Sequence, residues 1–228
     1  MNQDFFPLDG LYIKQPDQNI NVFIFDKAPK LKSKDLENGI SRFGGRWRSP
    51  SYLHAYYLSA CILLKEGNRE NYLDDIGLPL FYLQRHTTEL LIKRLLSWFY
   101  DIDDFDKSIL SKGQKDRLTD CHKLRKLYDD IQNSANILCF EKPPEELNEL
   151  VTLLEAYEKT DATWSRYSKT TYGDEHLPKE VAVPIKKIQS IIKMVISKTL
   201  YKDGLEVTYE TALYDAWLSL AKKNGHAG

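Results

Sequence analysis

The sequence is poor in cysteine. Its 228 residues include three cysteines, Cys61, Cys121 and Cys139, which are odd in number and widely spaced. This arrangement gives neither a disulfide framework nor the paired ligand spacing of a zinc site. We therefore expect reduced thiols in a cytoplasmic protein, with no metal and no other cofactor.

Long apolar runs and a charge excess are also lacking. No apolar stretch reaches the roughly 18 residues that a membrane span requires. The first ten residues, MNQDFFPLDG, have neither the basic start nor the apolar core of a signal peptide. The 32 basic and 33 acidic residues leave a net charge of -1, so binding to nucleic acid has to come from local patches. We expect no membrane association.

Two common catalytic signatures are missing as well. The chain contains no glycine-rich phosphate loop and no G-x-S-x-G elbow. Nucleotide hydrolysis by a P-loop and serine hydrolysis therefore have no support in the sequence.

The most informative stretch covers residues 77–100. Its apolar residues recur at intervals of three and four, which is typical of a helix, and Gly77 and Pro79 predict that the helix starts there. Apolar residues with similar spacing predict further helices over about 50–65, 115–133, 144–157, 179–201 and 208–223. An acidic loop over 101–106 and a long loop over 160–178 are expected between them. The predicted fold is mainly α, a bundle of five to seven helices.

The first 48 residues differ in character. Residues 11–13 and 21–25 are β-branched and aromatic around a turn-like segment, which predicts a small β-hairpin. A connection with one short helix near residues 33–36 follows. We predict an N-terminal hairpin and connecting segment over 1–48 and a helical bundle domain over 49–228.

The central helix carries a polar stripe. Tyr82, His86, Glu89 and Lys93 fall at helical spacing, with Arg85 beside them. Charged groups on a helix rich in leucine require partners, because burying a lone charge is costly.

Three phrases of the sequence resemble the HEPN superfamily (higher eukaryotes and prokaryotes nucleotide-binding). The helix over 77–100 reads RHTTELLIK from Arg85, similar to RHxxELxxK. Residues 119–124 read TDCHKL, like the family's T-H-D-L phrase. Residues 160–167, which include Asp161, Arg166 and Tyr167, look like its D-x-x-S…R-Y segment.

The resemblance implies a HEPN-like helical bundle, often a homodimer. Many members are metal-independent endoribonucleases in toxin or phage-defence systems, and others only bind RNA or a nucleotide. Active members carry an Arg followed four to six residues later by a His, and Arg117 and His122 match that spacing. His122 is then the general acid or base and Arg117 the phosphate ligand. Arg48 and His54 have the same kind of spacing, but at the other end of the fold.

Two interpretations of the polar residues remain open. In the first, His86, His122 and Arg166 converge to bind a phosphate, and the partner is RNA, a nucleotide, or a cognate antitoxin or defence protein. In the second, the same residues form a structural network of a non-catalytic interaction module, in which Glu89 accepts from His122 or Arg166 and Asp161 holds Arg166.

The segment over 42–48 is a further candidate for nucleic-acid contact. Arg42, Arg46 and Arg48 alternate with Phe43 and Trp47 around a glycine pair. Such a string can stack bases and hold phosphates, or it can be a linker whose aromatic side chains pack on the bundle.

Overall fold

The computed structural model describes residues 29–41, 52–106, 109–110, 112–158, 164–169, 172–200 and 207–224. Eight helices occur there and no β-strand, which confirms the prediction of a mainly α protein. The helices are α1 (Pro29–Glu37), α2 (Tyr52–Glu70), α3 (Leu73–Asp106), α4 (Lys112–Asp120), α5 (Leu124–Ile137), α6 (Glu145–Glu155), α7 (Ile185–Thr199) and α8 (Tyr209–Lys223). Within these ranges, no helix has the length and apolar content to cross a membrane.

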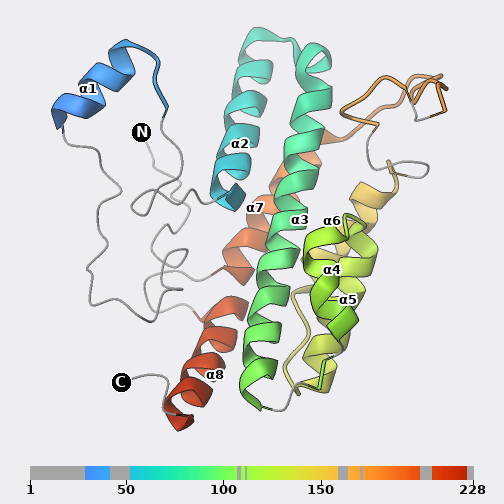
Figure 1. Cartoon of the computed structure of the whole chain (residues 1–228). Coiled ribbons are helices and arrows are strands. Elements are labelled where there is room, and N and C mark those ends of the chain that lie inside the picture. Colours follow the sequence, from blue (N-terminus) through green and yellow to red (C-terminus); the bar gives the residue numbers. More distant parts are fainter. Residues whose placement is uncertain are drawn as a thin grey trace.

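Helix α3 is the axis of the bundle. Its 34 residues span about 51 Å at 1.5 Å per residue. It packs against α2, α4, α5, α6, α7 and α8, and Figure 1 shows it running through the middle of the molecule. Leu91, Leu95, Leu96 and Phe99 of α3 are completely buried, so the core is built on this helix.

The predicted start of this helix was wrong. α3 begins at Leu73 and passes through both Gly77 and Pro79, and α2 likewise continues past Gly67 to Glu70. A proline interrupts only one helical hydrogen bond, and the acidic residues Asp74 and Asp75 favour the earlier first turn. A Cβ on Gly67 would lie 2.7 Å from Ile76 Cδ1, so this glycine allows the two helices to approach closely.

The acidic segment over 101–106 is helical and not the predicted loop. It forms the end of α3, and Asp103 there is fully buried. The Asp103 carboxylate accepts from the backbone N–H groups of Ile109 at 2.7 Å and Leu110 at 3.2 Å, and lies 3.1 Å from Lys115 Nζ. A buried carboxylate therefore closes the turn from α3 to α4.

Two other predicted helices have different limits. The one over 115–133 is divided into α4 and α5 by residues 121–123, because the backbone carbonyl of His122 accepts from Arg85 and leaves the helical pattern. The one over 179–201 begins only at Ile185, since Pro184 disfavours helical backbone in the residue before it. The proposed hairpin over 11–25, and with it the boundary at residue 48, lies outside the described residues.

Helix α8 begins as the sequence predicted. Thr208 is its N-cap: its hydroxyl accepts from the Thr211 N–H at 3.3 Å, and the Thr211 hydroxyl accepts from the Thr208 N–H at 3.3 Å. Thr208 is also buried, so water cannot replace these bonds well.

We predict that Thr208→Ala lowers the free energy of unfolding by about 1–2 kcal/mol, because the first turn of α8 loses its cap. Chemical denaturation measures this loss. Thr208→Ser keeps the hydroxyl and should recover most of the loss; equal losses in the two variants would contradict the cap.

Candidate functional site

Glu89, in the middle of α3, is the centre of a buried cluster of charges. Only 2% of its side chain is exposed. Its Oε1 lies 2.9 Å from Lys93 Nζ and 2.8 Å from His122 Nδ1, while its Oε2 pairs with the Arg85 guanidinium. Burial alone would raise the pKa of Glu89, but the hydrogen bonds from Lys93 and His122 and the charge of Arg85 hold it below its usual value. The carboxylate is therefore ionised at neutral pH.

Arg85 connects this carboxylate to two other parts of the chain. Its side chain is 6% exposed, and its Nε donates to Glu158 Oε1 at 2.5 Å. Its Nη2 donates to the backbone carbonyl of His122. Arg85 thus ties α3 to the end of α6 and to the segment between α4 and α5. Burial raises the pKa of Glu158 in spite of the neighbouring Arg85.

His122 is the exposed member of the cluster. Its side chain is 66% exposed, although its Nδ1 contacts the buried Glu89. An ionised carboxylate only accepts, so in the neutral imidazole Nδ1 carries the proton and Nε2 keeps its lone pair. A buried carboxylate behind a largely exposed imidazole is an arrangement suited to general acid–base chemistry.

His86 lies one turn along the same face of α3. Its Nδ1 is 4.0 Å from Glu89 Oε2, which is too far for a hydrogen bond. Its ring stacks on Tyr82 with centroids 5.6 Å apart and meets the Tyr56 ring edge-on at 4.4 Å. Burial lowers the pKa of His86, more than the nearby Glu89 raises it. This histidine is neutral at pH 7.

Arg166 and Tyr167 extend the row beyond Tyr82. The Arg166 guanidinium lies over both the Tyr82 and the Tyr167 rings, 5.5 Å from each centroid. The sequence left open whether Glu89 accepts from His122 or from Arg166. In the structure Glu89 accepts from His122. Tyr82, Arg85, His86, Glu89, Lys93 and His122 form one contiguous group, with Arg166 and Tyr167 at its edge.

Several predicted site residues are not placed beside this group. Arg117 lies on α4, five residues before His122, and its side chain is outside the description. Asp161 and the segment with Arg42, Arg46, Trp47 and Arg48 also lie outside the described residues. His54, of the second Arg–His pair, lies on α2 and is partly buried.

Glu158 is the member of the site that the sequence did not reveal. It follows α6 in a segment without helical periodicity, and no motif includes it. The only signal was the presence of Arg85 on an otherwise leucine-rich helix, which required more carboxylate than Glu89 alone supplies.

Comparison with known proteins assigns no family. No protein-family model matches the chain, and searches of curated proteins and of solved structures find no significant match.

We predict that Arg85→Met lowers the free energy of unfolding by about 3–5 kcal/mol, because it leaves Glu89 and Glu158 buried without their shared cation. Urea denaturation gives the value. The control is Arg69→Met on α2, an exposed arginine that also pairs with two glutamates, Glu66 and Glu70, and should cost about 1 kcal/mol or less. Similar losses in both variants would show that the Arg85 pairs do not matter for folding.

We predict that the melting temperature falls as the pH decreases from about 7.5 to about 5.5. Burial lowers the pKa of His86 in the folded protein below its ordinary value of 6.5. As the pH falls below 6.5, His86 is therefore protonated in the unfolded chain while it is still largely neutral in the folded chain. Stability is therefore full above this pH and is lost as the pH falls. His54, whose pKa burial also lowers, contributes in the same direction.

The variant His86→Phe keeps the stacked ring but does not titrate, so its melting temperature should fall less over the same range. Glu158, whose raised pKa acts in the opposite direction, is present in both proteins and cancels in the comparison. Parallel curves for the variant and the wild type would assign the pH dependence to other groups.

Proposed function

We propose that this protein is a HEPN-like protein that binds RNA or a nucleotide and cleaves RNA without a metal ion, in a toxin or phage-defence setting. The contact between Glu89 and His122 carries the proposal. It joins a buried, ionised carboxylate to Nδ1 of an imidazole that is 66% exposed. The resemblance of residues 85–93 and 119–124 to HEPN motifs supports the choice of RNA as substrate.

The chemistry follows from the tautomer that Glu89 imposes. Nε2 of His122 takes the proton from a ribose 2′-OH, and the 2′-oxygen then attacks the adjacent phosphorus. The bond from phosphorus to the 5′-oxygen breaks, and that oxygen takes up a proton. The products are a 2′,3′-cyclic phosphate and a 5′-hydroxyl. Glu89 stabilises the imidazolium that forms after the first proton transfer.

Positive charge beside His122 supports phosphate binding. Lys93 lies on the other side of the same Glu89 oxygen and its side chain is 15% exposed. The family resemblance assigns Arg117, which lies on α4 five residues before His122, to the phosphate. A cation near the scissile phosphate stabilises the negative charge that builds up during cleavage.

A second candidate function is a non-catalytic interaction module, and the contacts of Arg85 favour it. Arg85 is buried and uses its donors on Glu89, Glu158 and the backbone of His122, all within the protein. In this function the cluster holds three segments together, and a homodimer or a partner protein carries the activity.

Incubation of the purified protein with total RNA in EDTA tests the first function. We expect cleavage with 2′,3′-cyclic phosphate ends, and a loss of about 100-fold or more in His122→Ala, in line with the removal of a general acid–base group. Because His122→Ala also removes a hydrogen bond to the buried Glu89, we expect some loss of stability, and cleavage is compared at a temperature at which circular dichroism shows both proteins folded. Lys123→Ala, which changes the exposed neighbour, is the matched control and should cleave like the wild type.

Two outcomes oppose the ribonuclease. Cleavage that persists in His122→Ala comes from another residue or a contaminant. A folded wild type that leaves RNA intact supports the interaction module instead, and in that case size-exclusion chromatography with light scattering shows whether the protein forms a homodimer.

A further inference from the structure

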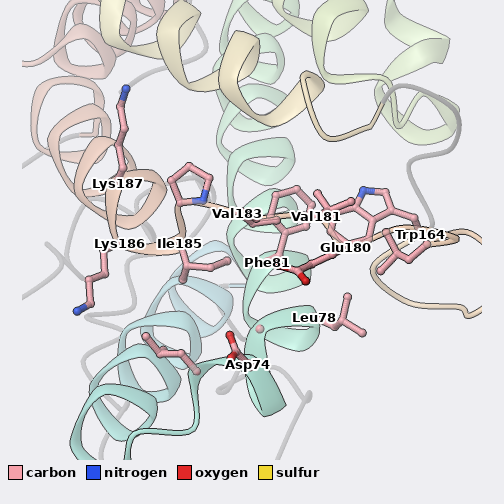
Figure 2. Close-up of a pocket in the computed structure, with 15 residues that line it drawn as sticks. Asp74, Leu78, Phe81, Trp164, Glu180, Val181, Val183, Ile185, Lys186 and Lys187 are labelled. Atoms are coloured by element: carbon pink, nitrogen blue, oxygen red, sulfur yellow. The ribbon is translucent and has the colours of Figure 1, made fainter.

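A pocket of about 970 Å³ lies at the opposite end of α3 from its contact with α4. The first turns of α3, Trp164, Leu177, residues 180–184 and the start of α7 line it, and we call it the α3–α7 pocket (Figure 2). It shares no lining residue with the cluster around Glu89. Its volume is in the range of pockets that hold small organic molecules.

The interior of the α3–α7 pocket is apolar and aromatic. Phe81 and Trp164 are buried, with ring centroids 4.9 Å apart and planes inclined by 34°. Leu78, Leu177 and Val181 line the same space and remain 44%, 40% and 46% exposed. Large apolar side chains that stay exposed together are typical of a surface that another molecule covers.

Trp164 also offers an unused hydrogen-bond donor. Its side chain lines the pocket, its Nε1 is buried, and this nitrogen has no acceptor in the part of the chain that the structure describes. Buried donors without an acceptor are rare in proteins, and an ammonium group only donates, so we expect a water molecule and not the amine of a ligand to accept from this nitrogen.

At the mouth of the pocket, the acidic and the basic side chains point in different directions. Figure 2 shows the carboxylates of Asp74 and Glu180 directed toward the middle of the pocket, and the ammonium groups of Lys186 and Lys187 directed away from it. Among the described residues, neither carboxylate has an ion pair or a side-chain hydrogen bond. Lys187 instead lies 3.8 Å from Glu149 of α6. The pocket therefore presents unneutralised negative charge beside an aromatic floor.

We propose that the α3–α7 pocket binds an organic cation, a protonated amine attached to an aromatic or alkyl body. The amine pairs with Asp74 and Glu180, and the body packs on Phe81 and Trp164, where an ammonium group also gains from the face of the indole. An anionic ligand of the same shape would meet the two carboxylates and is disfavoured. This site does not depend on the proposed ribonuclease activity.

Three probes with one common body test the assignment on the full chain: 4-phenylbutylammonium, the neutral 4-phenylbutanol and the anionic 5-phenylpentanoate. Isothermal titration calorimetry gives their affinities, and the emission of Trp164 reports occupancy of the floor. We expect the cation to bind about tenfold or more tighter than the anion, which corresponds to about 1.4 kcal/mol, with the alcohol between them. Trp164→Phe should remove the change in emission while retaining binding.

The double variant Asp74→Asn/Glu180→Gln should lose about tenfold in affinity for the cation and retain its affinity for the alcohol. The matched control is Lys186→Gln/Lys187→Gln, which changes two charges on the same rim and should leave binding of the cation intact. All four side chains are exposed, so both variants should melt like the wild type.

Three results would overturn the proposal. The first is the absence of saturable binding of the ammonium probe. The second is binding of the anion as tight as that of the cation, especially if the double lysine variant abolishes it. The third is undiminished binding of the cation after both carboxylates are neutralised.

Discussion

The buried Glu89 carboxylate constrains more of this structure than any other single group. A charge that is 2% exposed is tolerated only with partners, and its partners come from two places in the chain. Arg85 and Lys93 lie within α3, whereas His122 lies between α4 and α5. Because Arg85 also contacts Glu158 and the His122 carbonyl, the carboxylate fixes where α4 ends and how α6 ends near α3. The same constraint determines the orientation of the imidazole on which the proposed chemistry depends.

A second buried carboxylate, on α8, also pairs with polar side chains of α3. Glu210 of α8 is 1% exposed and accepts from Arg94 Nε and Trp98 Nε1, each at 2.6 Å. Gln84 contacts the Ile185 carbonyl at 3.0 Å and Gln189 at 2.9 Å on α7. Polar residues at successive turns of α3 therefore select which helix packs at each level, while the leucines between them supply the apolar burial. Such pairing gives specificity to a bundle whose apolar faces are chemically alike.

Much of this architecture could be predicted from the sequence, and the errors have physical causes. Apolar periodicity identified α3, α6, α7 and α8, because this signal is local. The start of α3 was misread from local signals, since Asp74 and Asp75 already favoured a first turn before Pro79. The limits at 101–106 and 121–123 depend on tertiary contacts: the Asp103 carboxylate on the backbone of residues 109 and 110, and Arg85 on the His122 carbonyl. Local propensity contains none of these. The polar stripe from Tyr82 to Lys93 indicated that partners were needed, and the family resemblance suggested His122. Arg85 indicated that a further carboxylate was needed, but the identity of Glu158 and the α3–α7 pocket arise from packing between distant segments, which no motif of the sequence encodes.

The central position of α3 has a consequence for the order in which the chain folds during synthesis. Its polar side chains find their partners on α7 and α8 more than 100 residues later, as with Gln84 and Ile185, which are 101 positions apart, and Arg94 and Glu210, which are 116 apart. A ribosome therefore releases α3 long before the helices that cover two of its flanks exist. Until α7 and α8 emerge, the nascent chain exposes leucines and charges that are buried in the folded protein, so completion of the core waits for the synthesis of these two helices.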